Sequence, residues 1–112
     1  MENHKLVLPE HLNQYGYLFG GHLLMWVDEI AWIAATLEFP DCLFVTVGMD
    51  EVAFHKSVRE GAILKFQTDL EKRGRTSVTY GVVVRRDEDM IFSTRVTLVR
   101  VDDSGAKMPL PV

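Results

Sequence analysis

The sequence contains few of the residues that build disulfide-linked, membrane-spanning or nucleic-acid-binding proteins. A single cysteine among 112 residues excludes an intramolecular disulfide and makes a reducing compartment, the cytoplasm, the expected location. The longest uncharged run, residues 11–27, is broken by polar residues and glycines, so it lacks the ~18 apolar residues that a membrane span requires. Acidic residues outnumber basic ones by 16 to 12, and the net charge of −4 argues against a nucleic-acid partner.

The sequence also lacks the residues that two kinds of site require, the nucleophile elbow of a serine hydrolase and a histidine metal site. No Gly-x-Ser-x-Gly segment is present, which excludes the nucleophile elbow of a serine hydrolase. The four histidines do not have the spacing of metal ligands, so no metal site is expected. Cys42 begins a strand-like segment and is interpreted as a small buried hydrophobe. The length fits a single domain over residues 1–112.

What is present is one helix followed by strands. Residues 21–37 hold 12 apolar residues in 17 and end before Pro40, which predicts a long apolar helix. Alternating apolar and polar residues after it predict a curved antiparallel sheet with hairpin connections that wraps this central helix, an α+β fold. A short strand is expected before residue 9, a loop over residues 9–20 and a frayed or loosely packed tail after residue 101. The main strands are expected over residues 42–54, 62–72, 76–85 and 90–101.

The predicted helix is too apolar for one sheet to cover. A sheet encloses one side of a helix, and the remaining apolar sides need a second cover. A second copy of the chain is the simplest one, so we expect a homodimer at least.

Asp28 lies on an apolar face of this helix, whereas Glu29 lies on a polar stripe with His22 and Thr36 and is expected to face solvent. The pattern leaves two interpretations of Asp28 open. In the first, the Asp28 carboxylate accepts a hydrogen bond from nearby backbone or from a tyrosine across an interface. In the second, desolvation of the carboxylate tunes it to act as a general base or nucleophile. Its neighbours at one and two turns are small or apolar: Gly21, Leu24, Met25, Ala31, Trp32 and Ala35.

The pair Gly20-Gly21 stands at the start of the helix. Without Cβ atoms these residues let a ligand approach the backbone, and the free amides of a helix N-terminus favour negative charge. Such amides would suit a developing oxyanion. Gly21 lies about 10 Å from Asp28 along the helix axis, which leaves room for an acyl group between them.

Residues 9–29, PEHLNQYGYLFGGHLLMWVDE, resemble the signature of the hotdog-fold acyl-CoA thioesterases, in the acyl-CoA hydrolase family. The segments Val45-Thr46-Val47 and Gly74-Arg75-Thr76-Ser77 extend the resemblance, as does the stretch from residue 99 to residue 111. It therefore covers nearly the whole chain.

The resemblance implies a hotdog domain that hydrolyses acyl-CoA thioesters. In such enzymes two protomers join their sheets edge to edge, and the active sites form across that interface. Asp28 would act as general base or nucleophile, Asn13 would contribute from the partner subunit, and amides around Gly20 and Gly21 would polarise the carbonyl. Tetramers or hexamers are the expected larger assemblies. No separate cofactor is expected, because coenzyme A is part of the substrate. The acyl groove is assigned to Phe19, Leu24 and Trp32.

A basic segment offers contacts for the phosphates of coenzyme A. Residues 55–75 have a net charge of +3, whereas the remainder of the chain has a net charge of −7. The side chains around the Gly74 turn are the first choices among the candidates, which are Lys72, Arg73, Arg75, Ser77, Lys56 and Arg59.

Two alternatives to a thioesterase remain open. A hotdog dehydratase or hydratase acting on acyl thioesters typically pairs a histidine with a carboxylate, but His22 lies on the stripe with Glu29 rather than beside Asp28. A non-catalytic acyl-CoA-binding module would keep the groove without turnover.

Overall fold

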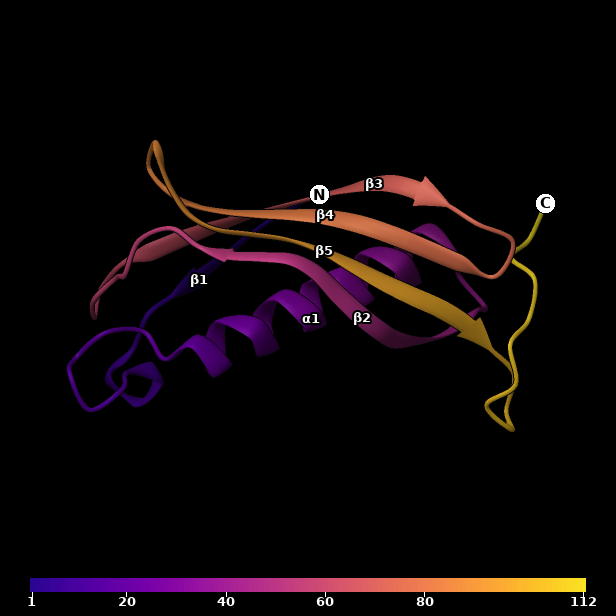
Figure 1. Cartoon of the computed structure of the whole chain (residues 1–112), viewed down its shortest axis with the longest axis horizontal. Coiled ribbons are helices and arrows are strands. Elements are labelled where there is room, and N and C mark those ends of the chain that lie inside the picture. The colour runs from indigo at the N-terminus through magenta and orange to yellow at the C-terminus, as the bar shows by residue number, and fades with distance from the viewer.

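The computed structural model describes residues 1–112 and contains one long helix and five strands (Figure 1). The helix and the four long strands each begin and end within one residue of the predicted bounds. The loop predicted over residues 9–20 contains one short 3-10 helix. In chain order the elements are β1 (Glu2–Leu6), η1 (Pro9–His11), α1 (Gly20–Glu38), β2 (Leu43–Phe54), β3 (Ile63–Arg73), β4 (Ser77–Arg86) and β5 (Asp89–Val101).

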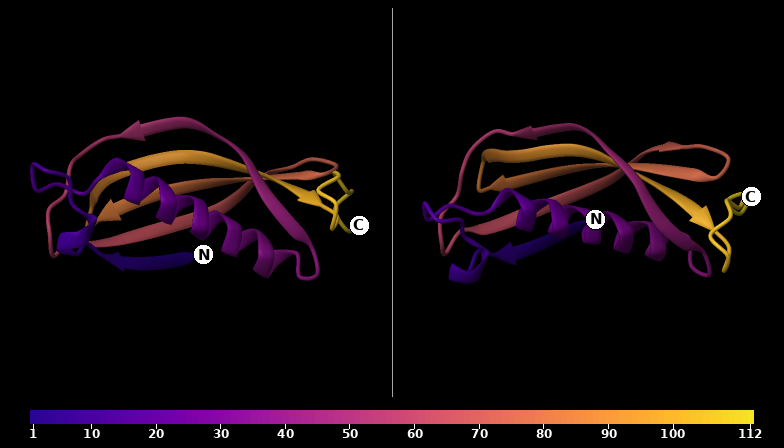
Figure 2. Two further views of the ribbon diagram at one scale, coloured as in Figure 1. Left: turned by 90° about the horizontal axis from the view of Figure 1, so that it is seen from below. Right: turned by 60° about the horizontal axis from the view of Figure 1, so that its bottom comes forward.

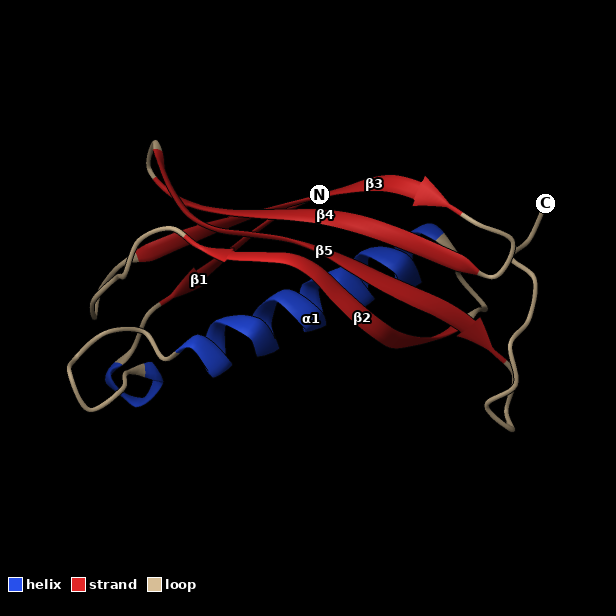
Figure 3. Cartoon of the chain, viewed as in Figure 1, coloured by secondary structure: helices blue, strands red, loops and turns tan.

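The five strands form one antiparallel sheet in the order β1-β3-β4-β5-β2. The sheet is curved, and α1 lies along its concave side (Figures 2 and 3). This is the arrangement expected from the resemblance. β2 is an edge strand, so one side of its backbone has no partner within the chain.

The core lies between α1 and the inner face of the sheet. Period-two alternation places Phe66 and Tyr80 inward from β3 and β4, and both are almost completely buried. Trp26 packs edge-on against Phe66, with ring centroids 6.3 Å apart, and joins the helix to the sheet. Cys42 is buried in the same cluster, as predicted.

Part of the apolar surface of α1 remains uncovered. Met25, Trp32 and Leu37 are 54%, 44% and 69% exposed. The sheet covers one side of the helix only, and the prediction that the chain needs a second cover agrees with this surface. No helix of the chain combines the length and the apolar character that crossing a lipid bilayer requires.

Of the two alternatives predicted for the tail, frayed or loosely packed, the first is wrong: the tail is ordered, although most of its residues are exposed. Asp102 accepts hydrogen bonds from Ser104 and from the backbone amide of Ala106, which closes a turn after β5 and lowers the pKa of its carboxyl group. Leu110 is buried, and its amide donates to the carbonyl of Arg75. The Asx turn at Asp102 and the buried side chain of Leu110 therefore order a segment whose composition predicts little regular structure.

Tyr80 makes stability depend on alkaline pH. Its burial and its hydroxyl hydrogen bond to Glu38, 2.8 Å long, raise the pKa of Tyr80 above its ordinary value near 10. The unfolded chain therefore loses this proton at a lower pH than the folded chain, so the stabilisation is complete below pH 10 and is lost as the pH rises above it. We expect the free energy of unfolding to fall more steeply between about pH 9 and about pH 11 in the wild type than in Tyr80→Phe. Urea denaturation of both proteins across this range measures the difference, and parallel curves would contradict it.

Candidate active site

Asp28 is fixed by a side chain of the edge strand. It lies half-buried on α1 and accepts a 2.6 Å hydrogen bond from the hydroxyl of Thr46 on β2. A hydroxyl donor to a carboxylate makes a short, strong hydrogen bond, which restricts the rotation of the carboxyl group. The predicted bond to nearby backbone is not found, because the donor is the hydroxyl of Thr46. This hydrogen bond leaves a chemical role open, because the second carboxylate oxygen has no partner in the chain.

Sequence reasoning missed Thr46. The available signal was period-two alternation, because Phe44 is buried against the helix and Thr46 follows it on the same face of β2. Although Thr46 is exposed, its position on the face of β2 that carries Phe44 brings its hydroxyl to Asp28.

The helix N-terminus offers free donors. Phe19 occupies the N-cap position and supplies no side-chain cap, and the amides of Gly20 and Gly21 donate to no group in the chain. A Cβ on Gly21 would lie 2.9 Å from the ring of Phe19, so glycine at this position lets that ring lie against the first turn. These amides, with the positive end of the helix dipole, can stabilise an anion.

Asn13 lies in the loop that leads to this end of the helix. Its side-chain oxygen accepts hydrogen bonds from the amides of Tyr15 and Tyr17, at 2.9 and 3.1 Å, and so closes the loop. No hydrogen bond joins Asn13 to Asp28 within the chain.

The three residues predicted for the acyl groove lie on α1 or at its N-cap. Leu24 and Trp32 are each one turn from Asp28, and Phe19 is 53% exposed at the N-cap. Trp32 keeps its indole in place by donating to the carbonyl of Phe44 at 3.2 Å. These side chains make an apolar surface beside Asp28 but enclose no pocket within the single chain.

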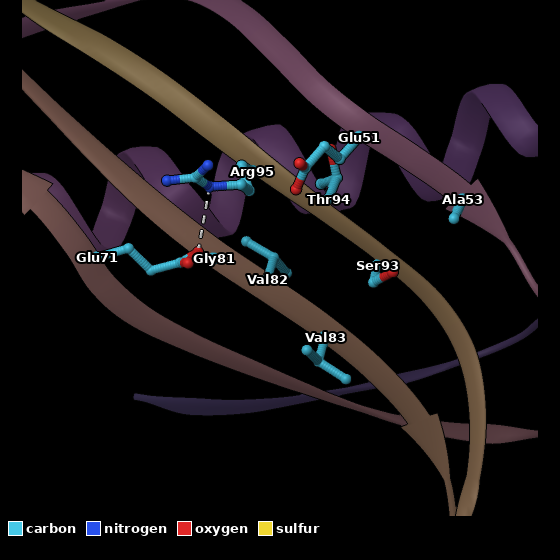
Figure 4. Close-up of a pocket in the computed structure, with 9 residues that line it drawn as sticks. All are labelled: Glu51, Ala53, Glu71, Gly81, Val82, Val83, Ser93, Thr94 and Arg95. Atoms are coloured by element: carbon cyan, nitrogen blue, oxygen red, sulfur yellow. Dashed lines mark ion pairs between the residues drawn. The ribbon is translucent and has the colours of Figure 1, made fainter.

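A hollow of about 410 Å³ lies elsewhere, on the face of the sheet that points away from α1 (Figure 4). Arg95 pairs there with Glu71 at 3.4 Å. None of the predicted site residues lines it. Its lining residues are Glu51, Ala53, Glu71, Gly81, Val82, Val83, Ser93, Thr94 and Arg95.

The predicted basic segment does not form one patch. Lys56 and Arg59 lie before β3, whereas Lys72, Arg73 and the Gly74 turn lie at its other end. The 11-residue strand β3 separates the two groups. Because an extended strand rises about 3.3 Å per residue, the two groups lie far apart. Net charge along the sequence could not reveal this separation, because the segment is one extended strand with a cluster at each end.

Several of these basic side chains already have partners. Lys56 pairs with Asp89 at 2.8 Å, and Arg59 donates to the hydroxyl of Tyr17 at 2.8 Å. Arg73 lies over the ring of Phe39 and donates to the carbonyl of Pro111.

The side chains of Lys72 and Arg75 have no ionic partner in the chain, and Ser77 lies beside Gly74 in the same turn. These two cations are therefore the ones most available to a phosphate.

Comparison with known proteins relates the chain to thioesterases. The family model of the thioesterase superfamily matches residues 15–93. Mouse acyl-coenzyme A thioesterase 11 is 31% identical over 80 residues, which make up 71% of this chain but only 13% of that protein. An uncharacterized acyl-CoA thioester hydrolase of Zymomonas mobilis is 30% identical over 112 residues, covering 95% of this chain and 74% of the relative.

Solved structures of bacterial proteins have the same architecture. The hexameric thioesterase of Yersinia pestis, 29% identical, superposes with a TM-score of 0.91 over 98% of this chain and 93% of its own. The acyl-CoA hydrolase of Staphylococcus aureus, also 29% identical, was solved with butyryl coenzyme A, coenzyme A and coenzyme A disulfide; its TM-score is 0.90, over 99% and 71% of the two chains. Further structures of that hydrolase carry alanine in place of one asparagine, one aspartate or one threonine. On its family match and its architecture, the chain belongs to the thioesterase superfamily and has the hotdog fold.

Proposed function

We propose that the chain hydrolyses acyl-CoA thioesters to coenzyme A and a carboxylic acid. The observation that carries the proposal is a carboxylate, Asp28, held by Thr46 and lying about 10 Å along the helix from the free amides of Gly20 and Gly21. An apolar surface flanks both groups, which suits an acyl chain.

The chemistry follows from these positions. The amides of Gly20 and Gly21 donate hydrogen bonds to the thioester carbonyl oxygen and stabilise the negative charge that develops on it. Asp28 either removes a proton from an attacking water or attacks the carbonyl carbon itself. In the first route a C–O bond forms with water, the C–S bond breaks, and the proton passes to the thiolate of coenzyme A. In the second route the Asp28 carboxylate forms a mixed anhydride as the C–S bond breaks and the thiolate leaves. Water then cleaves the anhydride, which releases the carboxylic acid, regenerates the Asp28 carboxylate and supplies the proton that the thiolate takes up.

Residue spacing in the Staphylococcus aureus hydrolase supports these assignments. The asparagine and the aspartate replaced by alanine in that protein are 15 residues apart, as are Asn13 and Asp28. The replaced threonine follows that aspartate by 17 residues, against 18 residues from Asp28 to Thr46.

A second copy of the chain is part of the proposal. The unpaired edge of β2 lies beside Thr46, and the neighbouring side chains of Val45 and Val47 are 45% and 58% exposed. Pairing of this edge with a second copy would cover that apolar surface and could bring the partner subunit's Asn13 toward Asp28. We propose a homodimer that assembles further into a tetramer or hexamer.

Coenzyme A phosphates are assigned first to Lys72 and Arg75, with Arg73 and Ser77 beside them. These cations and the helix N-terminus lie at opposite ends of one chain (Figure 1), so a dimer must supply the phosphate contacts and the carbonyl contacts from different protomers.

A ladder of acyl-CoA esters from acetyl to stearoyl, with one aryl thioester, tests the proposal through release of free thiol. Turnover supports a thioesterase and gives its chain preference. A rise in melting temperature with coenzyme A esters but without turnover would instead indicate a binding module. Loss of enoyl-CoA absorbance without thiol release would indicate a hydratase, and either of these results would contradict the proposal.

Thr46→Val should lower kcat about tenfold or more, because it removes a hydrogen bond to a charged group and leaves the carboxylate free to rotate. Valine matches threonine in shape, so the fold is expected to remain intact. Thr46→Ser keeps the hydroxyl and should retain most of the activity. Equal kcat values for the valine and serine variants would contradict a positioning role for Thr46.

A further inference from the structure

The loop over residues 12–18 carries Asn13 and has little packing of its own. Leu12 and Leu18 face each other at its base and rest against the core, whereas Tyr15 at its tip is 73% exposed. Asn13 uses its side-chain oxygen to close the loop, which leaves the Nδ2 amide as the donor that can face a substrate or a partner. The direction of that amide depends on whatever holds the loop.

Two contacts tie this loop to the segment between β2 and β3. The amide of Leu18 donates to the carbonyl of Val58 at 2.8 Å, and the side chain of the next residue, Arg59, covers the outer side of the loop. The Leu18 contact fixes only the end of the loop that adjoins the helix. The far side depends on Arg59.

Arg59 contacts the loop in three ways. Its guanidinium donates to the Tyr17 hydroxyl at 2.8 Å, and its Cζ lies 4.3 Å from the centroid of the Tyr17 ring. Its Nη1 lies 3.6 Å from the point that a Cβ on Gly16 would occupy, so it also covers the turn, where Gly16 has a φ of +85°. Arg59 forms no ion pair within the chain. The only hydrogen bond of its side chain is the one that it donates to Tyr17.

From this geometry we propose that Arg59 and Tyr17 form a clamp that positions Asn13 for the reaction, so that Arg59 acts as a positioning residue and not as a phosphate ligand. The clamp needs a planar cation that can stack on a ring and donate at once, which lysine cannot do. A phosphate contact, by contrast, would tolerate lysine as a point charge. This inference rests on the proposed thioesterase activity.

Steady-state kinetics of Arg59→Lys, Arg59→Ala and Tyr17→Phe test the clamp. We expect Arg59→Lys and Arg59→Ala each to lower kcat about tenfold, with KM changed less than about twofold, because a displaced group loses rate more than affinity. Glu60→Gln alters the adjacent exposed charge and serves as the matched control, with unchanged kcat. A rise in KM for Arg59→Ala that Arg59→Lys does not share would assign Arg59 to phosphate binding and overturn the clamp.

The same substitutions in an Asn13→Ala background give the decisive comparison. If the clamp acts through Asn13, its loss should cause no further fall in kcat once that side chain is gone. Additive losses in the two backgrounds would overturn the proposal.

Amide hydrogen exchange separates failure of the clamp from failure of the proposed activity. The amides of residues 13–18 should exchange faster in Arg59→Lys than in the wild type, whether or not the protein cleaves thioesters. Unchanged exchange would overturn the clamp on its own. Absence of turnover in the wild type, with faster exchange in the variant, would overturn the thioesterase proposal and leave the clamp as a structural feature.

Discussion

Replacing Asp28 with asparagine is expected to lower kcat for acyl-CoA hydrolysis by about a hundredfold to ten-thousandfold while leaving substrate affinity nearly unchanged. The amide oxygen of asparagine can still accept the hydrogen bond from Thr46, so the side chain should keep its position. An amide, however, can neither take a proton from water nor attack a thioester. Thiol-release assays at saturating acyl-CoA measure the loss, and calorimetric titration with coenzyme A measures affinity.

Glu29→Gln is the matched control for this prediction. Glu29 is the next residue of the same helix, but it is exposed and its only ionic contact is Lys5 at 3.8 Å. Its neutralisation should leave kcat within about twofold, as for a solvent-facing charge. A near-wild-type kcat in Asp28→Asn, or an equal loss in both variants, would remove Asp28 from the mechanism.

The elements of the fold could be predicted because each leaves a local signal. Alternation over β3 and β4 and the apolar run of α1 set the strand and helix bounds to within one residue. Such patterns report which side of an element is buried, and burial decides most of a small domain's architecture. The orientation of Asp28 on the helix could be inferred in the same way.

Contacts between distant segments could not be predicted by the same means. The hydrogen bond between Thr46 and Asp28 depends on how β2 lies against α1. The burial of Leu110 likewise depends on the assembled sheet. The basic residues show the same limit. Net charge along the sequence groups Arg59 with Arg75 in one basic segment, yet the strand between them places them at opposite ends of the molecule.

Replacing Phe66 with alanine is expected to destabilise the fold by about 3–5 kcal/mol, a large part of the 5–15 kcal/mol typical of a domain of this kind. Phe66 is completely buried on β3 and packs edge-on against Trp26, so its ring is one of the core contacts between the helix and the sheet. Its removal leaves a cavity that neither neighbour can fill, because Trp26 and the flanking strands are held by their own packing. Urea denaturation at one fixed protein concentration measures the loss, since assembly would make the midpoint depend on concentration.

Ile63→Ala on the same strand separates the loss of core packing from a general weakening of β3. Ile63 is 61% exposed and pairs with Leu6 on the outermost strand, so its truncation should cost less than about 1 kcal/mol. Similar losses in the two variants would mean that strand propensity, and not the contact between Phe66 and Trp26, sets the stability at this position. A large loss confined to Phe66→Ala would show that core packing between β3 and the helix carrying Asp28 stabilises the fold, and the position of Asp28 would then depend on a residue of the core.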